Sequence, residues 1–125
     1  RIFEKGDWRM KKKTNNNFLI IDIVFAILTI LVVISLFQNI LLASFLLAII
    51  SAIYIYIKKS KTVFFIFLIG AIWGPISEIL VISFSGAWFY SNPNVFGLIP
   101  FWLFFVWGNA AIFLYSISKY LDGLK

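Results

Sequence analysis

Apolar residues run along this chain in long stretches that short polar segments separate. The first stretch extends from Phe18 to Ile57, and only Gln38 and Asn39 interrupt it. One helix over that range would be about 60 Å long at ~1.5 Å per residue, twice the ~30 Å of a bilayer hydrocarbon core. The pattern therefore predicts two helices, over about 18–37 and 40–57, joined by a tight turn.

The next apolar stretch begins at Thr62, and small or polar residues weaken it after residue 84. It predicts a third helix over about 62–84. Pro75 lies inside this helix and cannot donate a backbone hydrogen bond to Ala71, so we expect a kink there.

A fourth helix is predicted over about 101–121, where the last apolar stretch lies. Pro100 suits its first turn, because the missing N–H has no intrahelical partner at that position. Ser91 to Asn94 reads as a turn between the third and fourth helices.

Composition identifies the kind of protein to which these helices belong. Of the 125 residues, 62% are hydrophobic and only 13% are charged, whereas soluble domains average about 45–50% and about 25%. The sequence therefore predicts a single-domain, all-α integral membrane protein, with four transmembrane helices in an up-down bundle.

The basic residues indicate the orientation of this bundle. All 11 fall on one side of the predicted arrangement, and the two opposite connections carry none. By the positive-inside rule, both termini are cytoplasmic, residues 1–17 form a basic cytoplasmic segment, and the protein resides in a cytoplasmic-type membrane. The net charge of +6 then indicates contact with membrane lipids rather than a nucleic-acid partner.

The run Met10-Lys11-Lys12-Lys13 resembles a translation start, which leaves two interpretations of residues 1–9: an upstream extension, or part of the native chain. The first apolar stretch is too long for a signal-peptide core.

The residue inventory limits the chemistry. The chain contains no His and no Cys, which excludes thiolate nucleophiles, His-based acid–base catalysis and His- or Cys-ligated metals. We expect no metal site and no cofactor, and the sequence assigns no catalytic residue.

Glu78 is the acidic residue placed deepest in a predicted span. A charge at the bilayer centre costs roughly 2.5–3.5 kcal/mol on insertion scales, so Glu78 should face the bundle or a partner. Gly70 and Gly74 precede it at four-residue intervals and predict close helix packing. Asn109, at a similar depth in the fourth helix, is its expected hydrogen-bond partner, and Ser77 completes the predicted intramembrane polar site.

Asp22 lies near the cytoplasmic end of the first helix, where we expect it to pair with Lys11–Lys13 or to meet water.

Four aromatic residues flank the predicted outer turn and form a candidate contact for a lipid or another hydrophobic ligand: Trp88, Tyr90, Trp102 and Trp107. Anchoring at the membrane interface is the simpler interpretation, since Trp and Tyr concentrate there.

The general plan is similar to that of the small multidrug-type antiporters, which have four short helices and one membrane Glu and function as dimers. In that family the Glu lies on the first helix, whereas Glu78 lies on the third, so no functional residue is carried over.

Three functional hypotheses follow. The leading one is a small non-catalytic membrane subunit that packs within a larger membrane complex or a homo-oligomer. The second is a proton-coupled transporter of small cations that acts as a dimer through Glu78. The third is a lipid- or isoprenoid-handling enzyme at the outer leaflet.

Overall fold

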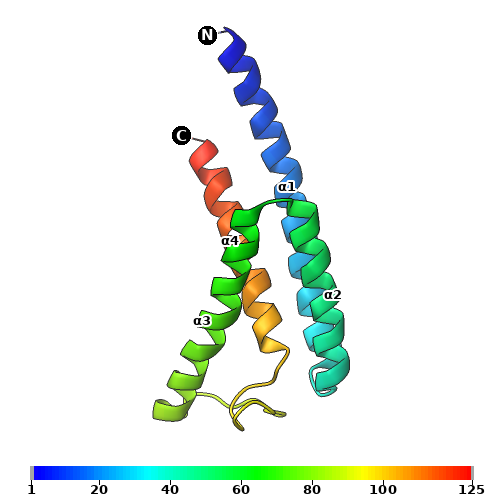
Figure 1. Ribbon diagram of the computed structural model, residues 1–125, viewed down its shortest axis with the longest axis vertical. Coiled ribbons are helices and arrows are strands. Elements are labelled where there is room, and N and C mark those ends of the chain that lie inside the picture. The colour runs from blue at the N-terminus through cyan, green and yellow to red at the C-terminus, as the bar shows by residue number, and fades with distance from the viewer. Residues whose placement is uncertain (1, 125) are drawn as a thin grey trace.

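The computed structural model describes the backbone of residues 2–124 and the side chains of residues 19–124. The chain forms four helices: α1 (Ile2–Leu36), α2 (Ile40–Lys58), α3 (Lys61–Ser85) and α4 (Leu103–Gly123). Both chain ends and the α2–α3 turn lie at one end of the bundle, and the other connections lie at the opposite end (Figure 1).

We call these the basic end, which carries Lys58, Lys59, Lys61 and Lys119, and the loop end, which comprises residues 37–39 and 86–102. Helix α1 begins at Ile2 rather than near residue 18, so the segment expected only as a basic terminus is helical.

Polar side chains define where the helices begin. Asn39 caps α2 by accepting a hydrogen bond from the Leu42 amide at 3.2 Å. Ser60 caps α3 in the same way, with Val63 as donor at 3.3 Å. These caps satisfy amides that have no intrahelical acceptor, so two short polar breaks suffice to separate three long apolar helices.

Helix α3 continues without interruption through Pro75. The Ser77 hydroxyl donates to the Gly74 carbonyl at 2.6 Å, one residue before the proline. The carbonyl that Pro75 leaves without an intrahelical donor is that of Ala71, so this hydroxyl bond does not replace the missing one. The kink expected here stays a prediction.

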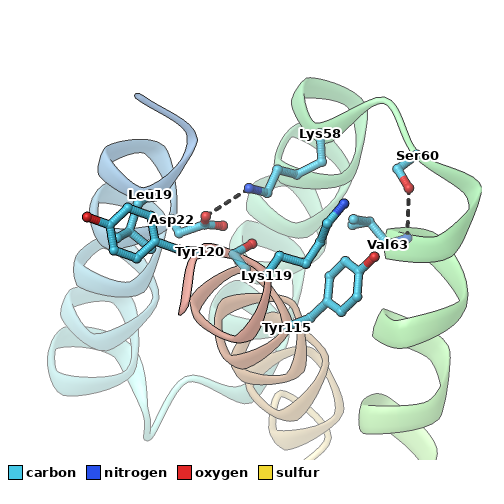
Figure 2. Close-up of a pocket in the computed structure, with 9 residues that line it drawn as sticks. Leu19, Asp22, Lys58, Ser60, Val63, Tyr115, Lys119 and Tyr120 are labelled. Carbon is cyan, nitrogen blue, oxygen red and sulfur yellow. Dashed lines mark hydrogen bonds and ion pairs between the residues drawn. The ribbon is translucent and has the colours of Figure 1, made fainter. Parts of the chain in front are cut away.

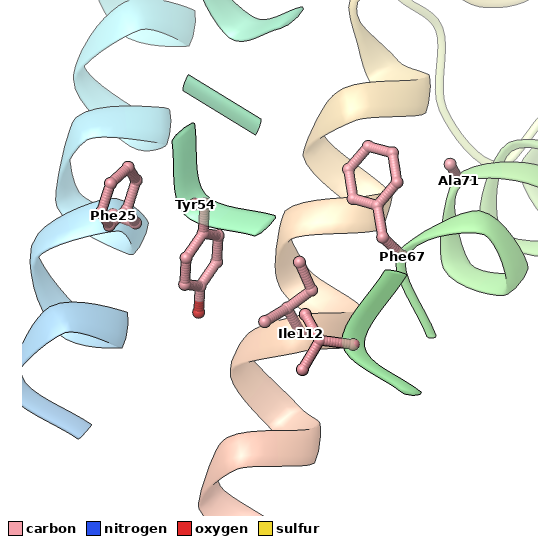
Figure 3. Packing of buried hydrophobic residues seen from close by; sticks show 6 residues of the cluster. Phe25, Tyr54, Phe67, Ala71 and Ile112 are labelled. Carbon is pink, nitrogen blue, oxygen red and sulfur yellow. The ribbon is translucent and has the colours of Figure 1, made fainter. Parts of the chain in front are cut away.

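Helix α4 is the centre of the bundle, because its contacts with the other three helices are together the most extensive, and it packs most extensively on α3. At the basic end, all four helices contribute to one apolar cluster around Ile112 of α4 (Figure 3). A second cluster at the loop end includes Leu47, Ile82, Ile99 and Trp102.

Helices α1, α2 and α3 are long and apolar enough to cross a membrane, which is compatible with an integral membrane protein. Many of their large apolar side chains are exposed, as lipid-facing residues would be. Helix α4 is less apolar because it carries Asn109, Ser116 and Lys119. Its central position buries Asn109 among protein neighbours, whereas Lys119 is exposed near the end of the helix.

Candidate functional site

Glu78 lies on the face of α3 that packs against α4. Gly70 and Gly74 precede it on this face, and there the two backbones approach closely. A Cβ atom at Gly74 would lie 2.0 Å from the Trp107 ring, and one at Gly70 would lie 2.8 Å from the Trp107 carbonyl oxygen. The two glycines therefore make the space that Trp107 fills, and Trp107 in turn reaches Glu78.

Three aromatic side chains donate hydrogen bonds to the Glu78 carboxylate. Tyr90 Oη and Trp88 Nε1 donate to Oε1 at 2.5 and 3.3 Å, and Trp107 Nε1 donates to Oε2 at 2.5 Å. Trp107 belongs to α4, whereas Trp88 and Tyr90 belong to the segment that follows α3. We call these four residues the carboxylate cluster. It ties the loop-end segment and α4 to one side chain of α3.

Burial, together with the hydrogen bond to Glu78, raises the pKa of the Tyr90 hydroxyl above its ordinary value. Tyr90 therefore keeps its proton at ordinary pH and remains a donor. A tryptophan N–H is also a donor only. All three groups bonded to Glu78 therefore act as hydrogen-bond donors to its side chain.

The loop-end segment is fastened to the α1–α2 turn as well. Asn92 donates to the Gln38 carbonyl at 2.7 Å, and the Trp102 indole donates to the Phe37 carbonyl at 3.1 Å. Trp102 is only 6% exposed and packs edge-on against Tyr90, with ring centroids 6.2 Å apart. Residues 86–102 thus cover the loop end of the bundle and contact both the α1–α2 turn and α3.

A tight turn within this segment orients its far half. Phe96 and Gly97 both have positive φ, at 55° and 70°, as two-residue reversals require. Val95 and Ile99 pair across the turn, with the Val95 amide donating to the Ile99 carbonyl at 2.9 Å. The reversal leads Ile99 into the core and the chain into α4.

The expected hydrogen bond between Glu78 and Asn109 is wrong. Asn109 lies on the opposite side of α4, where its Oδ1 accepts from Ser51 at 2.8 Å and its Nδ2 donates to Thr29 at 3.1 Å. All three side chains are buried, and they link α1, α2 and α4. Similar depth in two helices did not determine which faces meet, because α4 contacts three neighbours and its polar residue could face any of them.

Ser77 also does not join Glu78, since its hydroxyl bonds the α3 backbone as described above. Of the predicted polar site, the structure therefore keeps Glu78 alone and surrounds it with aromatic residues. Three of the four residues proposed as lipid contacts donate to its carboxylate, and Trp102 packs beside them.

A second buried polar group lies at the basic end and was not expected. Lys58 Nζ lies 2.8 Å from Asp22 Oδ2, with side chains 7% and 0% exposed. The Tyr54 hydroxyl donates to the other Asp22 oxygen, and the Tyr54 ring stacks on Phe25. Asp22 is thus paired with α2, whereas the side chains of Lys11–Lys13 lie outside the described residues. The spacing of Tyr54 and Lys58, one helical turn apart, was the available signal.

Two concave surfaces accompany these groups. At the loop end, a largely apolar groove of about 370 Å³ is lined by Val33, Ile34, Phe37, Tyr90, Ser91, Asn92, Pro100 and Trp102. At the basic end, a smaller and more polar pocket lies beside Asp22 and Lys58. Among the described residues, no three Asp or Glu side chains gather as a metal site would need.

Comparisons of the chain with protein-family models, with curated proteins and with solved structures find no match.

Proposed function

We propose that this protein is a small non-catalytic membrane subunit that packs within a larger membrane complex or a homo-oligomer. All four helices span the membrane in this proposal, and both termini are cytoplasmic. The observation that carries it is the hydrogen bonding of Glu78, the only acidic residue of α3, to three donors of the same chain. A carboxylate whose hydrogen bonds join α3 to α4 and to the segment after α3 supports a structural role of Glu78 rather than a catalytic one.

The outer face of α3 supplies the surface for a partner. Its apolar side chains, exposed at helical intervals, are Phe65, Ile69, Ile72, Trp73, Ile76, Leu80 and Phe84. Trp73 is 70% exposed and lies about 18 Å along α3 from Lys61, near the middle of a ~30 Å hydrocarbon core. Tryptophan normally lies at the membrane interface, where its N–H meets polar groups. A partner subunit that offers a hydrogen-bond acceptor at this depth would satisfy it.

The test is the composition of the natively extracted protein, combined with photo-crosslinking. A benzophenone amino acid replaces Trp73 in one variant and Ile30, an exposed residue of α1, in the control. We expect stoichiometric co-purification of a second copy or another membrane protein, and a discrete protein crosslink from position 73 only. A monomeric protein that crosslinks only to lipid from both positions would contradict the proposal.

Handling of a hydrophobic ligand is the second candidate, and the loop-end groove favours it. The groove of about 370 Å³ lies within the ~300–1,000 Å³ of small-molecule sites and is mostly apolar, as they are. A lipid or isoprenoid chain retained by the purified protein, and lost on Trp102→Ala but not Trp73→Ala, would support it. The proton-coupled transporter has less support, because Glu78 would first have to leave its three donors.

A further inference from the structure

The pocket at the basic end has the features of a phosphate site. Its volume is about 140 Å³ and its lining comes from α1, α2, α4 and the start of α3. That space is several times the ~30 Å³ of a water molecule in the liquid, so a tetrahedral phosphate group fits. Figure 2 shows Asp22, Lys58 and Lys119 gathered around it.

The described charges around this pocket sum to a positive value. Asp22 balances the charge of Lys58, with which it is paired, so the excess positive charge of the described lining is that of Lys119. Asp22 is fully buried, lines the pocket together with Lys58, and holds the Lys58 ammonium group in place at 2.8 Å. The Lys58 side chain is more than nine-tenths buried, so its ammonium group is held in one position, unlike that of a solvated surface lysine.

Lys119 completes the positive side of the pocket from α4. Its Nζ lies 5.6 Å from the centre of the Tyr115 ring, which also lines the pocket. The hydroxyl groups of Ser60 and Ser116 are further hydrogen-bonding groups in the lining. Ammonium and hydroxyl donors around a small space are the groups that bind phosphate oxygens.

We propose that this pocket binds a phosphate group, with Lys58 and Lys119 as its ammonium donors. The end of the bundle on which it lies carries Lys59 and Lys61 as well. In a membrane, basic residues of this kind lie at the surface of an anionic leaflet. The phosphate therefore comes either from the headgroup of an anionic lipid or from a soluble phosphate, and the two sources share the same recognition chemistry.

The experiment uses the full chain in neutral detergent. Native mass spectrometry counts the phosphatidylglycerol retained in an equimolar mixture with phosphatidylcholine, and ³¹P NMR line broadening measures binding of inorganic phosphate. We expect the wild type to retain the anionic lipid preferentially. Lys119→Gln should weaken that binding about tenfold, the loss expected for one charge-assisted hydrogen bond, and Lys119→Arg should restore most of it.

Lys61→Gln is the matched control, because it removes the same charge from an exposed residue near the same end that does not line the pocket. It should change binding less than about twofold, because Lys61 does not line the pocket, although its loss lowers the net charge of the protein by as much as Lys119→Gln does. If inorganic phosphate competes with the lipid and also depends on Lys119, the site is confirmed with soluble phosphate as a ligand. Equal losses in both Gln variants, or no binding of either phosphate compound to the wild type, would overturn the proposal.

Discussion

Glu78 shows how a single side chain can organise one end of a helix bundle. Its two carboxylate oxygens accept from donors of α4 and of the segment after α3. An unpaired carboxylate in hydrocarbon would be costly, and unpaired indole and phenol donors would add to that cost. Each hydrogen bond therefore offsets the cost of burying both of its partners. We expect the free-energy effects of mutations within the carboxylate cluster to be strongly coupled.

Glu78→Ala should destabilise the fold by about 2–3 kcal/mol, because it leaves several donors without an acceptor. Glu78→Gln should cost less, since Gln keeps one acceptor oxygen for Tyr90 and Trp88 but turns its amide donor toward Trp107. The free energy of unfolding in detergent, measured with a chemical denaturant, checks both values.

A double-mutant cycle isolates the contact. Trp107→Phe should cost at least about 1 kcal/mol less in the Glu78→Gln background than in the wild type, because the hydrogen bond it removes is already lost there. Additive costs would show that Glu78 and Trp107 are not coupled.

At the scale of the helices, α4 has two polar sides with different tasks. One side presents Trp107 to Glu78 of α3, and the other presents Asn109 to Thr29 and Ser51. Interhelical hydrogen bonds in membranes contribute only about 0.6 kcal/mol on average. Close packing must therefore supply most of the α3–α4 stability, and the glycines of α3 allow it.

Gly74→Ala should separate α3 from α4, since the added Cβ would meet the Trp107 ring at 2.0 Å. Overpacking of this kind costs typically ~1–3 kcal/mol. Ser83→Ala, at an exposed position of the same helix, is the control and should change stability little. Denaturant unfolding measures both, and equal stability of the Gly74→Ala variant and the wild type would contradict the packing described above.

At the scale of the whole molecule, the two ends differ in chemistry. The basic end carries lysines and a buried ion pair, and the loop end is closed by aromatic and amide groups. Of these differences, the basic residues are the ones that distinguish the two faces of a membrane, because Lys and Arg concentrate on the cytoplasmic side whereas Trp and Tyr lie at both interfaces.

We therefore predict that the loop end faces away from the cytoplasm. The chain has no cysteine, so single reporters can be introduced without background. Asn94→Cys, at an exposed position of the loop end, should react with an impermeant thiol reagent added outside intact cells, and Ser60→Cys should react only after permeabilisation. The reverse pattern would invert the topology.

Several features were available from the sequence alone because they depend on local composition. The continuous apolar stretches, broken at Asn39 and Ser60, predict helices whose backbone groups bond internally, as hydrocarbon requires. The gathering of the basic residues at one end follows from the same helix count, since four consecutive helices return the chain to the end at which it started. Gly70, Gly74 and Glu78 share a face because of helical periodicity.

Only the tertiary structure decided which faces meet. Periodicity places Asn109 on a face of α4 but does not say which of three neighbouring helices that face touches, and the structure directs it to Ser51 and Thr29. The partners of Glu78 lie ten to 29 positions away along the chain, beyond the reach of any helical repeat. The fold of residues 86–102 brings Trp88 and Tyr90 back onto α3, and packing against Gly74 orients Trp107. Contacts of this range depend on how all the helices pack together, which no local pattern in the chain encodes.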